Sequence, residues 1–137
     1  MQTLWKCSLS LAGLYGAAVV GMSAAISHYF QFNMVTEEFS RLVSSTAVLA
    51  FQALAILALS LYGQAAARRD ELNKAQHWLL ALVILGFHLG LWCFVYTVWA
   101  GLFELPLYWR QLAPVGGQML ILCWAGLMLL PWLRKNK

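Results

Sequence analysis

The chain has little charge. Only 10% of its 137 residues are charged, and five of these are acidic, whereas 62% are hydrophobic. Soluble domains usually contain about 25% charged and about 45–50% apolar residues. A soluble fold of this length could not bury so much apolar surface. The composition therefore excludes an ordinary globular domain and indicates a polytopic membrane protein.

The chain also lacks a long polar segment in which a soluble catalytic domain could fold. It has no nucleophile–base pattern, no phosphate-binding loop and no zinc-ligand spacing. The net charge of +4 comes from a few basic residues near the ends of apolar runs, which is a topology signal and not a nucleic-acid-binding patch. The sequence therefore predicts a non-enzymatic protein without catalytic residues, cofactor, metal or nucleic-acid partner.

Cysteine and histidine are both scarce. Cys7, Cys93 and Cys123 are odd in number and have no paired spacing, which excludes a disulfide framework and favours small packing residues. His28 lies near the end of the first apolar run and His88 near the middle of the third. At about 1.5 Å per residue their depths differ by roughly 12–15 Å. One haem iron therefore cannot bind both histidines.

Four apolar runs are present, at about residues 8–30, 41–63, 77–102 and 114–133. About 20 residues are needed to cross the hydrocarbon core. The sequence predicts an all-α integral membrane protein in which residues 1–137 form one domain, a four-transmembrane-helix bundle. The first run is expected to be an uncleaved helix, because it is too long for a signal peptide and three more runs follow. Pro114 suits the first turn of the fourth helix.

The basic residues predict the orientation of this bundle. Four spans place both termini on one side, and lysine and arginine favour the cytoplasmic side. With the loop at 64–76, the terminal side carries Lys6, Arg68, Arg69, Lys74, Arg134, Lys135 and Lys137. The opposite side carries only Arg41 and Arg110. We therefore expect cytoplasmic N- and C-termini.

Small residues recur at four-residue spacing in the first run. Gly13, Ala17, Gly21 and Ala25 would form one smooth stripe on a helix, because residues i and i+4 share a face. In lipid, close backbone contact between small residues draws helices together, since burial of apolar side chains gains nothing there. The stripe is predicted to be a helix-packing seam, either within the chain or between chains.

Short motifs follow one another along three of the runs. The first run ends in small residues before a histidine, the second contains an aromatic residue followed by Gln52, and the fourth begins with a paired glycine and later carries a tryptophan and a glycine. These motifs read Ser23-Ala-Ala-Ile-Ser-His28, Phe51-Gln-Ala-Leu-Ala-Ile56, Pro114-Val-Gly-Gly117 and Trp124-Ala-Gly126.

In this order the motifs resemble an uncharacterised family of small four-helix membrane proteins, which includes the bacterial YgdD-type inner-membrane proteins and a related eukaryotic transmembrane family. The chain departs from the family pattern twice. Serine and alanine replace the glycines before His28, and Gln52 replaces a second-helix histidine. The resemblance implies a four-helix fold and a place in the bacterial inner (plasma) membrane. It implies no activity, because the family has no established one.

Five residues are candidates for a polar site. His28, near the outer end of its helix, is expected to hold the first loop in place or to serve a proton, metal or ligand role. His88 and Gln52 have matching depth, and a hydrogen bond between them would be worth about 0.6–2 kcal/mol. Gly116 and Gly117 predict either an unwound, re-entrant start to the fourth helix or a tight turn that permits close packing.

Two functions follow from these patterns. The preferred interpretation is an assembly or accessory protein of the lipid bilayer that forms a homo-oligomer or joins a larger membrane complex, because the small-residue stripe is present and catalytic patterns are not. The alternative is a small transporter, channel or ligand carrier with a polar cavity around Gln52 and His88. The sequence identifies neither a substrate nor a partner.

Overall fold

The computed structural model of the chain describes residues 2–69, 71–105 and 111–133, and these residues form helices joined by short turns. In order, the helices are α1 (Gln2–Ala25), η1 (Ile26–Phe30), α2 (Gln31–Asn33), α3 (Thr36–Arg69), α4 (Lys74–Leu91), η2 (Trp92–Tyr96), α5 (Thr97–Leu102) and α6 (Leu112–Leu129). The π-helical turns η1 and η2 continue their neighbours. The described part of the chain therefore contains four rods that are long and apolar enough to cross a membrane: 2–33, 36–69, 74–102 and 112–129.

All four rods begin before the predicted apolar runs, and two of them begin or end at recognisable signals. The third begins at Lys74 because Asn73 and Gln76 form a reciprocal capping box, in which each side chain accepts a hydrogen bond from the other's backbone N–H. The fourth carries Pro114 in its first turn and ends at Leu129, two residues before Pro131. These signals set the ends of a helix more closely than hydropathy does.

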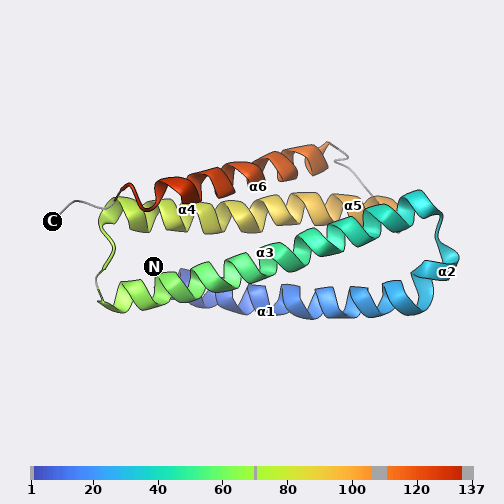
Figure 1. Cartoon of the computed structure of the whole chain (residues 1–137), viewed down its shortest axis with the longest axis horizontal. Helices are drawn as coiled ribbons and strands as arrows, with labels where there is room; N and C mark the ends of the chain where they lie inside the picture. The colour runs from blue at the N-terminus through green and yellow to red at the C-terminus, as the bar shows by residue number, and fades with distance from the viewer. Residues whose placement is uncertain (1, 70, 106–110, 134–137) are drawn as a thin grey trace.

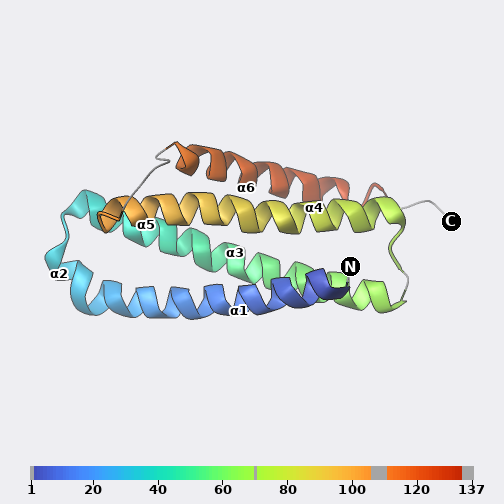
Figure 2. The ribbon, with the colours of Figure 1, turned by 180° about the vertical axis from the view of Figure 1, so that it is seen from behind.

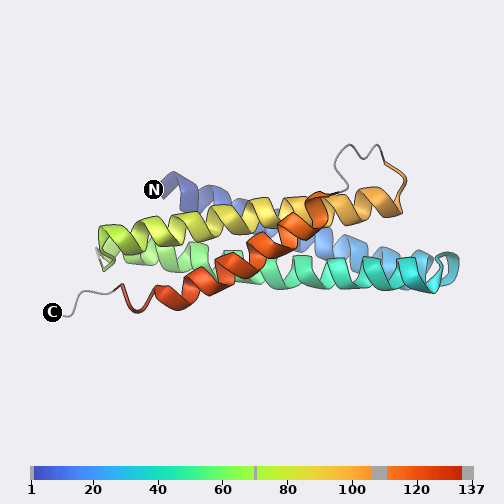
Figure 3. The same ribbon diagram turned by 90° about the horizontal axis from the view of Figure 1, so that it is seen from above.

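The rods form two antiparallel hairpins that lie side by side (Figure 1). In one hairpin α1 packs on α3, in the other α4–α5 packs on α6, and α3 joins them by contacting α4. Figures 1 and 2 show α1 and α6 on opposite sides of the bundle, and Figure 3 shows α6 crossing obliquely over α4. The start of α1, the end of α6 and the α3–α4 turn share one end, here called the terminal end, while α2 and the end of α5 lie at the other, the α2 end.

The core lies where α1, α3 and α4 meet. Its larger cluster includes Ile56, Phe87 and Leu91, and a second cluster toward the terminal end is built around Trp5. Trp5 is completely buried, and its indole lies 3.0 Å from the position that a Cβ on Gly63 would occupy. The tryptophan therefore depends on a glycine in the facing helix.

Candidate functional site

The small-residue stripe of α1 faces outward. Gly13, Ala17 and Gly21 are exposed and Ala25 is half-buried, and nothing lies within 4 Å of a Cβ placed on Gly13 or Gly21. The buried residues of α1 are Trp5, Ser8, Ala12 and Tyr15. For Gly13, Ala17 and Gly21, the possibility that the stripe packs against helices of its own chain is therefore wrong. We call Gly13, Ala17 and Gly21 the outer α1 face.

A glycine contact does exist inside the chain, between α4–η2 and α6. A Cβ on Gly116 would lie 2.6 Å from the carbonyl oxygen of Gly90 and 2.6 Å from the backbone nitrogen of Phe94. One turn away, Gly86 lies directly against the sulfur of Cys123. Gly86 and Gly90 are four residues apart, the same spacing as in the small-residue stripe of α1. The prediction of helix packing through the α1 stripe missed this second pair. We call Gly86, Gly90 and Gly116 the glycine seam.

The paired glycines of α6 are regular helical residues. Gly116 and Gly117 both lie inside α6, and no described glycine has a positive φ angle. An unwound or re-entrant start to the fourth helix is therefore wrong. Gly116 serves close packing instead, whereas a Cβ on Gly117 would meet nothing closer than a Phe94 ring carbon at 3.9 Å.

His28 does not hold the first loop. It is exposed in η1, and its side chain makes no hydrogen bond within the described ranges of the chain. The turn is held by other groups: the Asn33 side chain donates to the Tyr29 carbonyl at 2.7 Å, and the Met34 N–H donates to the Phe30 carbonyl at 3.0 Å. Local bonds of this kind make a histidine contact unnecessary.

His88 joins the two hairpins. Its Nδ1 lies 2.9 Å from the Tyr15 hydroxyl and its Nε2 lies 3.1 Å from the Ser8 hydroxyl. Ser8 and Tyr15 are seven residues apart, so both face the same side of α1. A neutral imidazole has one donor and one acceptor nitrogen, and a hydroxyl can serve either, so both ring nitrogens are satisfied. Ser8, Tyr15 and His88 form what we call the histidine clasp.

Gln52 makes no hydrogen bond to His88. The predicted hydrogen bond between them is wrong, because hydroxyl groups of α1 occupy both ring nitrogens of the histidine. Gln52 is only 3% exposed, and its side-chain oxygen has no hydrogen-bond partner in the part of the chain that the structure describes. The sequence interpretation missed Ser8 and Tyr15, although their seven-residue spacing marks a shared helix face. The five predicted polar-site residues therefore do not form one site.

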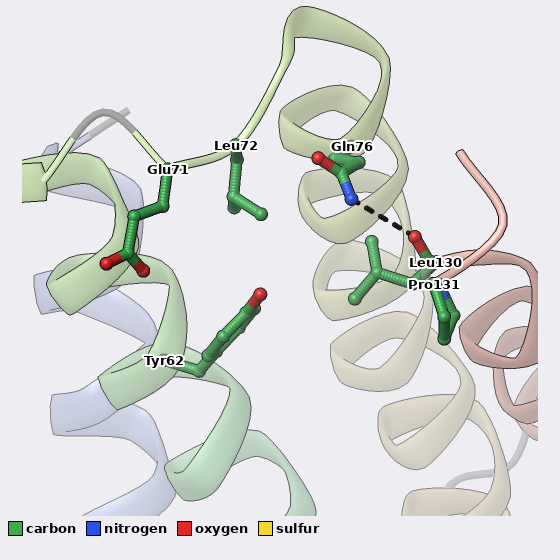
Figure 4. Close-up of a pocket in the computed structure, with 6 residues that line it drawn as sticks. All are labelled: Tyr62, Glu71, Leu72, Gln76, Leu130 and Pro131. Carbon is green, nitrogen blue, oxygen red and sulfur yellow. Dashed lines mark hydrogen bonds between the residues drawn. The ribbon is translucent and has the colours of Figure 1, made fainter. Parts of the chain in front are cut away.

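Clefts are formed elsewhere in the described part of the chain, and two of them are of similar size. One, of about 330 Å³, lies between α1 and η2–α5, has apolar and aromatic walls and includes Tyr15 and Trp92. The other, of about 350 Å³, lies at the terminal end and is lined by Tyr62, Glu71, Leu72, Gln76, Leu130 and Pro131 (Figure 4). Neither cleft is lined by Gln52 or His88. Within residues 2–69, 71–105 and 111–133, no three His, Cys, Asp or Glu side chains gather as a metal site requires.

Comparisons of the chain with protein-family models, with curated proteins and with solved structures found no match. The resemblance to the YgdD-type family therefore stays a prediction that depends on the four motifs quoted above. Function has to be argued from the contacts and exposed faces of this chain.

Proposed function

We propose that this chain is a non-enzymatic, multi-pass membrane protein that acts by lateral association, as a homo-oligomer or as an accessory subunit of a larger membrane complex. The observation that carries the proposal is the outer α1 face, where three small residues are exposed and the space beside both glycines is empty. Such a surface lets a second helix approach closely, and close approach is the main source of helix association in lipid.

The side chains around this face support the same function. Leu14 is 63% exposed and Val20 is 70% exposed. Both lie three residues from Ala17, so they flank the small residues on the helix surface. Small residues between exposed apolar side chains leave space that the ridge of a partner helix can fill.

The membrane placement is proposed from charge and from the four apolar rods. Among the described residues, Lys6, Arg68, Arg69 and Lys74 belong to the terminal end, and Arg41 belongs to the α2 end. The other residues in the sequence count, Arg110, Arg134, Lys135 and Lys137, lie outside the described residues. The excess at the terminal end supports cytoplasmic termini. The YgdD-type resemblance supports the bacterial inner membrane.

The transporter alternative has less support. It requires Gln52 and His88 to line a common cavity, but neither residue lines the two clefts described above. His88 uses both nitrogens to join α1 to α4, which is a structural role. We therefore favour association over transport.

Replacing Gly21 with leucine tests the proposal. Because nothing lies within 4 Å of the new Cβ, the fold should accept the side chain, while a partner helix could no longer approach. We expect association in mild detergent or liposomes, measured by native mass spectrometry and energy transfer, to weaken by about tenfold or more, which corresponds to about 1.4 kcal/mol.

Ala125→Leu is the matched control, since Ala125 is exposed on α6 at the opposite side of the bundle. It should leave association unchanged. Unchanged association in Gly21→Leu, or a loss only in Ala125→Leu, would show that copies or partners meet through another surface.

A further inference from the structure

The terminal-end cleft lies where the two hairpins separate (Figure 4). Tyr62 enters it from α3, Glu71 and Leu72 from the α3–α4 turn, and Gln76 from the first turn of α4. The residues that follow α6 close the far side. Figure 4 shows the Tyr62 hydroxyl pointing from α3 into the space between the hairpins, while the Glu71 carboxylate hangs from the turn over α3 at the edge of that space. The cleft therefore combines an acid and a phenol with apolar walls.

The Gln76 side chain of this cleft already makes two hydrogen bonds. The Gln76 amide donates to the Leu130 carbonyl at 3.2 Å, and its oxygen accepts from the Asn73 backbone N–H at 3.1 Å. The Glu71 carboxylate remains half-exposed, and its ion pair with Arg69, at 3.6 Å, joins two exposed side chains and is weak. Among the described residues, the polar side chains of the cleft that make no hydrogen bond are the Glu71 carboxylate and the Tyr62 hydroxyl.

A carboxylate and a phenol oxygen that line one cleft suit a cation that carries N–H donors, since both oxygens can accept hydrogen bonds. A primary ammonium has three such donors and makes charge-assisted hydrogen bonds with a carboxylate. A quaternary ammonium has the same charge and no N–H. The cleft should therefore distinguish between these two headgroup amines.

The surroundings of the cleft favour a lipid over a free amine. Leu72 and Pro131 supply apolar wall, and the cleft lies at the end of the apolar rods. Arg68 and Arg69 close α3 and Lys74 opens α4, so positive charge suited to a lipid phosphate surrounds this end. We propose that the terminal-end cleft binds the ethanolamine headgroup of a phospholipid, an inference that rests on the membrane placement in the proposed function.

Lipid titration of the purified full chain in mild detergent tests this site. Palmitoyl-oleoyl phosphatidylethanolamine and palmitoyl-oleoyl phosphatidylcholine have the same tails and phosphate, and they differ only at the amine, where methyl groups replace the N–H donors in the choline lipid. By native mass spectrometry, we expect the ethanolamine lipid to bind about three- to tenfold more tightly. Glu71→Gln should reduce this ratio to about one, since it removes the charge and keeps the shape. Glu38→Gln, an exposed acid at the α2 end, should keep it.

Equal binding of the two lipids to the natural chain, or an unchanged ratio in Glu71→Gln, would overturn the proposal. Free ethanolamine lacks the phosphate and the tails and should not compete. Competition by it at the lipid's own concentration would mean a site for soluble amines and would overturn the assignment to a lipid. The ratio of the affinities for the two lipids is measured separately on the natural chain and on each variant, and Gly21→Leu should leave it unchanged. Failure of this proposal and failure of association are therefore separate results.

Discussion

The glycine seam predicts opposite effects for two neighbouring alanine substitutions. Gly116 and Gly117 are adjacent residues of the same helix, α6. A methyl group on Gly116 would lie 2.6 Å from backbone atoms of Gly90 and Phe94, a distance that real Cβ contacts essentially never show. A methyl group on Gly117 would be in ordinary van der Waals contact with the Phe94 ring.

The two effects can be estimated from these contacts. Replacing a helical glycine by alanine gains about 1 kcal/mol of helix propensity at either position. Overpacking usually costs about 1–3 kcal/mol, and we take the upper end for Gly116 because backbone atoms cannot rotate out of the way. Gly116→Ala should therefore lose about 2 kcal/mol and Gly117→Ala should gain up to about 1 kcal/mol. The pair should differ by about 3 kcal/mol.

Unfolding by sodium dodecyl sulfate in mixed micelles, followed by the fluorescence of the seven tryptophans, measures this difference. Far-ultraviolet circular dichroism checks that both variants keep their helices before titration. If Gly116→Ala proves as stable as Gly117→Ala, then α4 and α6 do not approach as closely as the seam requires. A loss of the same size in both variants would indicate that lipid contact, and not the seam, controls stability here.

Two further substitutions test the contacts between the hairpins. Tyr15→Phe removes one hydroxyl from the histidine clasp and should lower the free energy of unfolding by about 0.6–1.7 kcal/mol. Tyr29→Phe changes an exposed tyrosine and should leave this free energy unchanged. Equal free energies of unfolding in the two variants would exclude a hydrogen bond between Tyr15 and His88. Trp5→Ala empties a completely buried site and should lower the free energy of unfolding by about 3–5 kcal/mol. Trp132→Ala changes an exposed tryptophan and should lower it by less than about 0.5 kcal/mol. A similarly small effect of Trp5→Ala would contradict the packing of the second core cluster.

The existence of four long apolar helices is predictable because apolar length and its interruptions can be read directly along the chain. The structure confirms them among the described residues. The direction in which each helix faces is harder to predict. The outer α1 face and the pair Gly86 and Gly90 share the same four-residue spacing, yet one is exposed and the other lies against α6. In lipid the outward side of a helix is as apolar as its inward side, so hydrophobic periodicity does not separate them.

The partner of His88 illustrates the same difficulty. The matching depth of Gln52 and His88, which both lie near the middle of their helices, predicted a hydrogen bond between them. Depth does not give the angle around the helix, and the histidine instead meets Ser8 and Tyr15 of α1. The terminal-end cleft could not be predicted from the sequence either, because Tyr62 and Pro131 come together only through the packing of the two hairpins.

The histidine clasp also has a consequence for the order in which the chain is assembled. Its two hydrogen bonds span 73 and 80 residues of sequence. Chains are made from the N-terminus. Ser8 and Tyr15 are therefore synthesised before His88, and their bonds to it can form only after the third rod is in place. The clasp thus forms only once residues of both hairpins are present, and it links the first hairpin to the second.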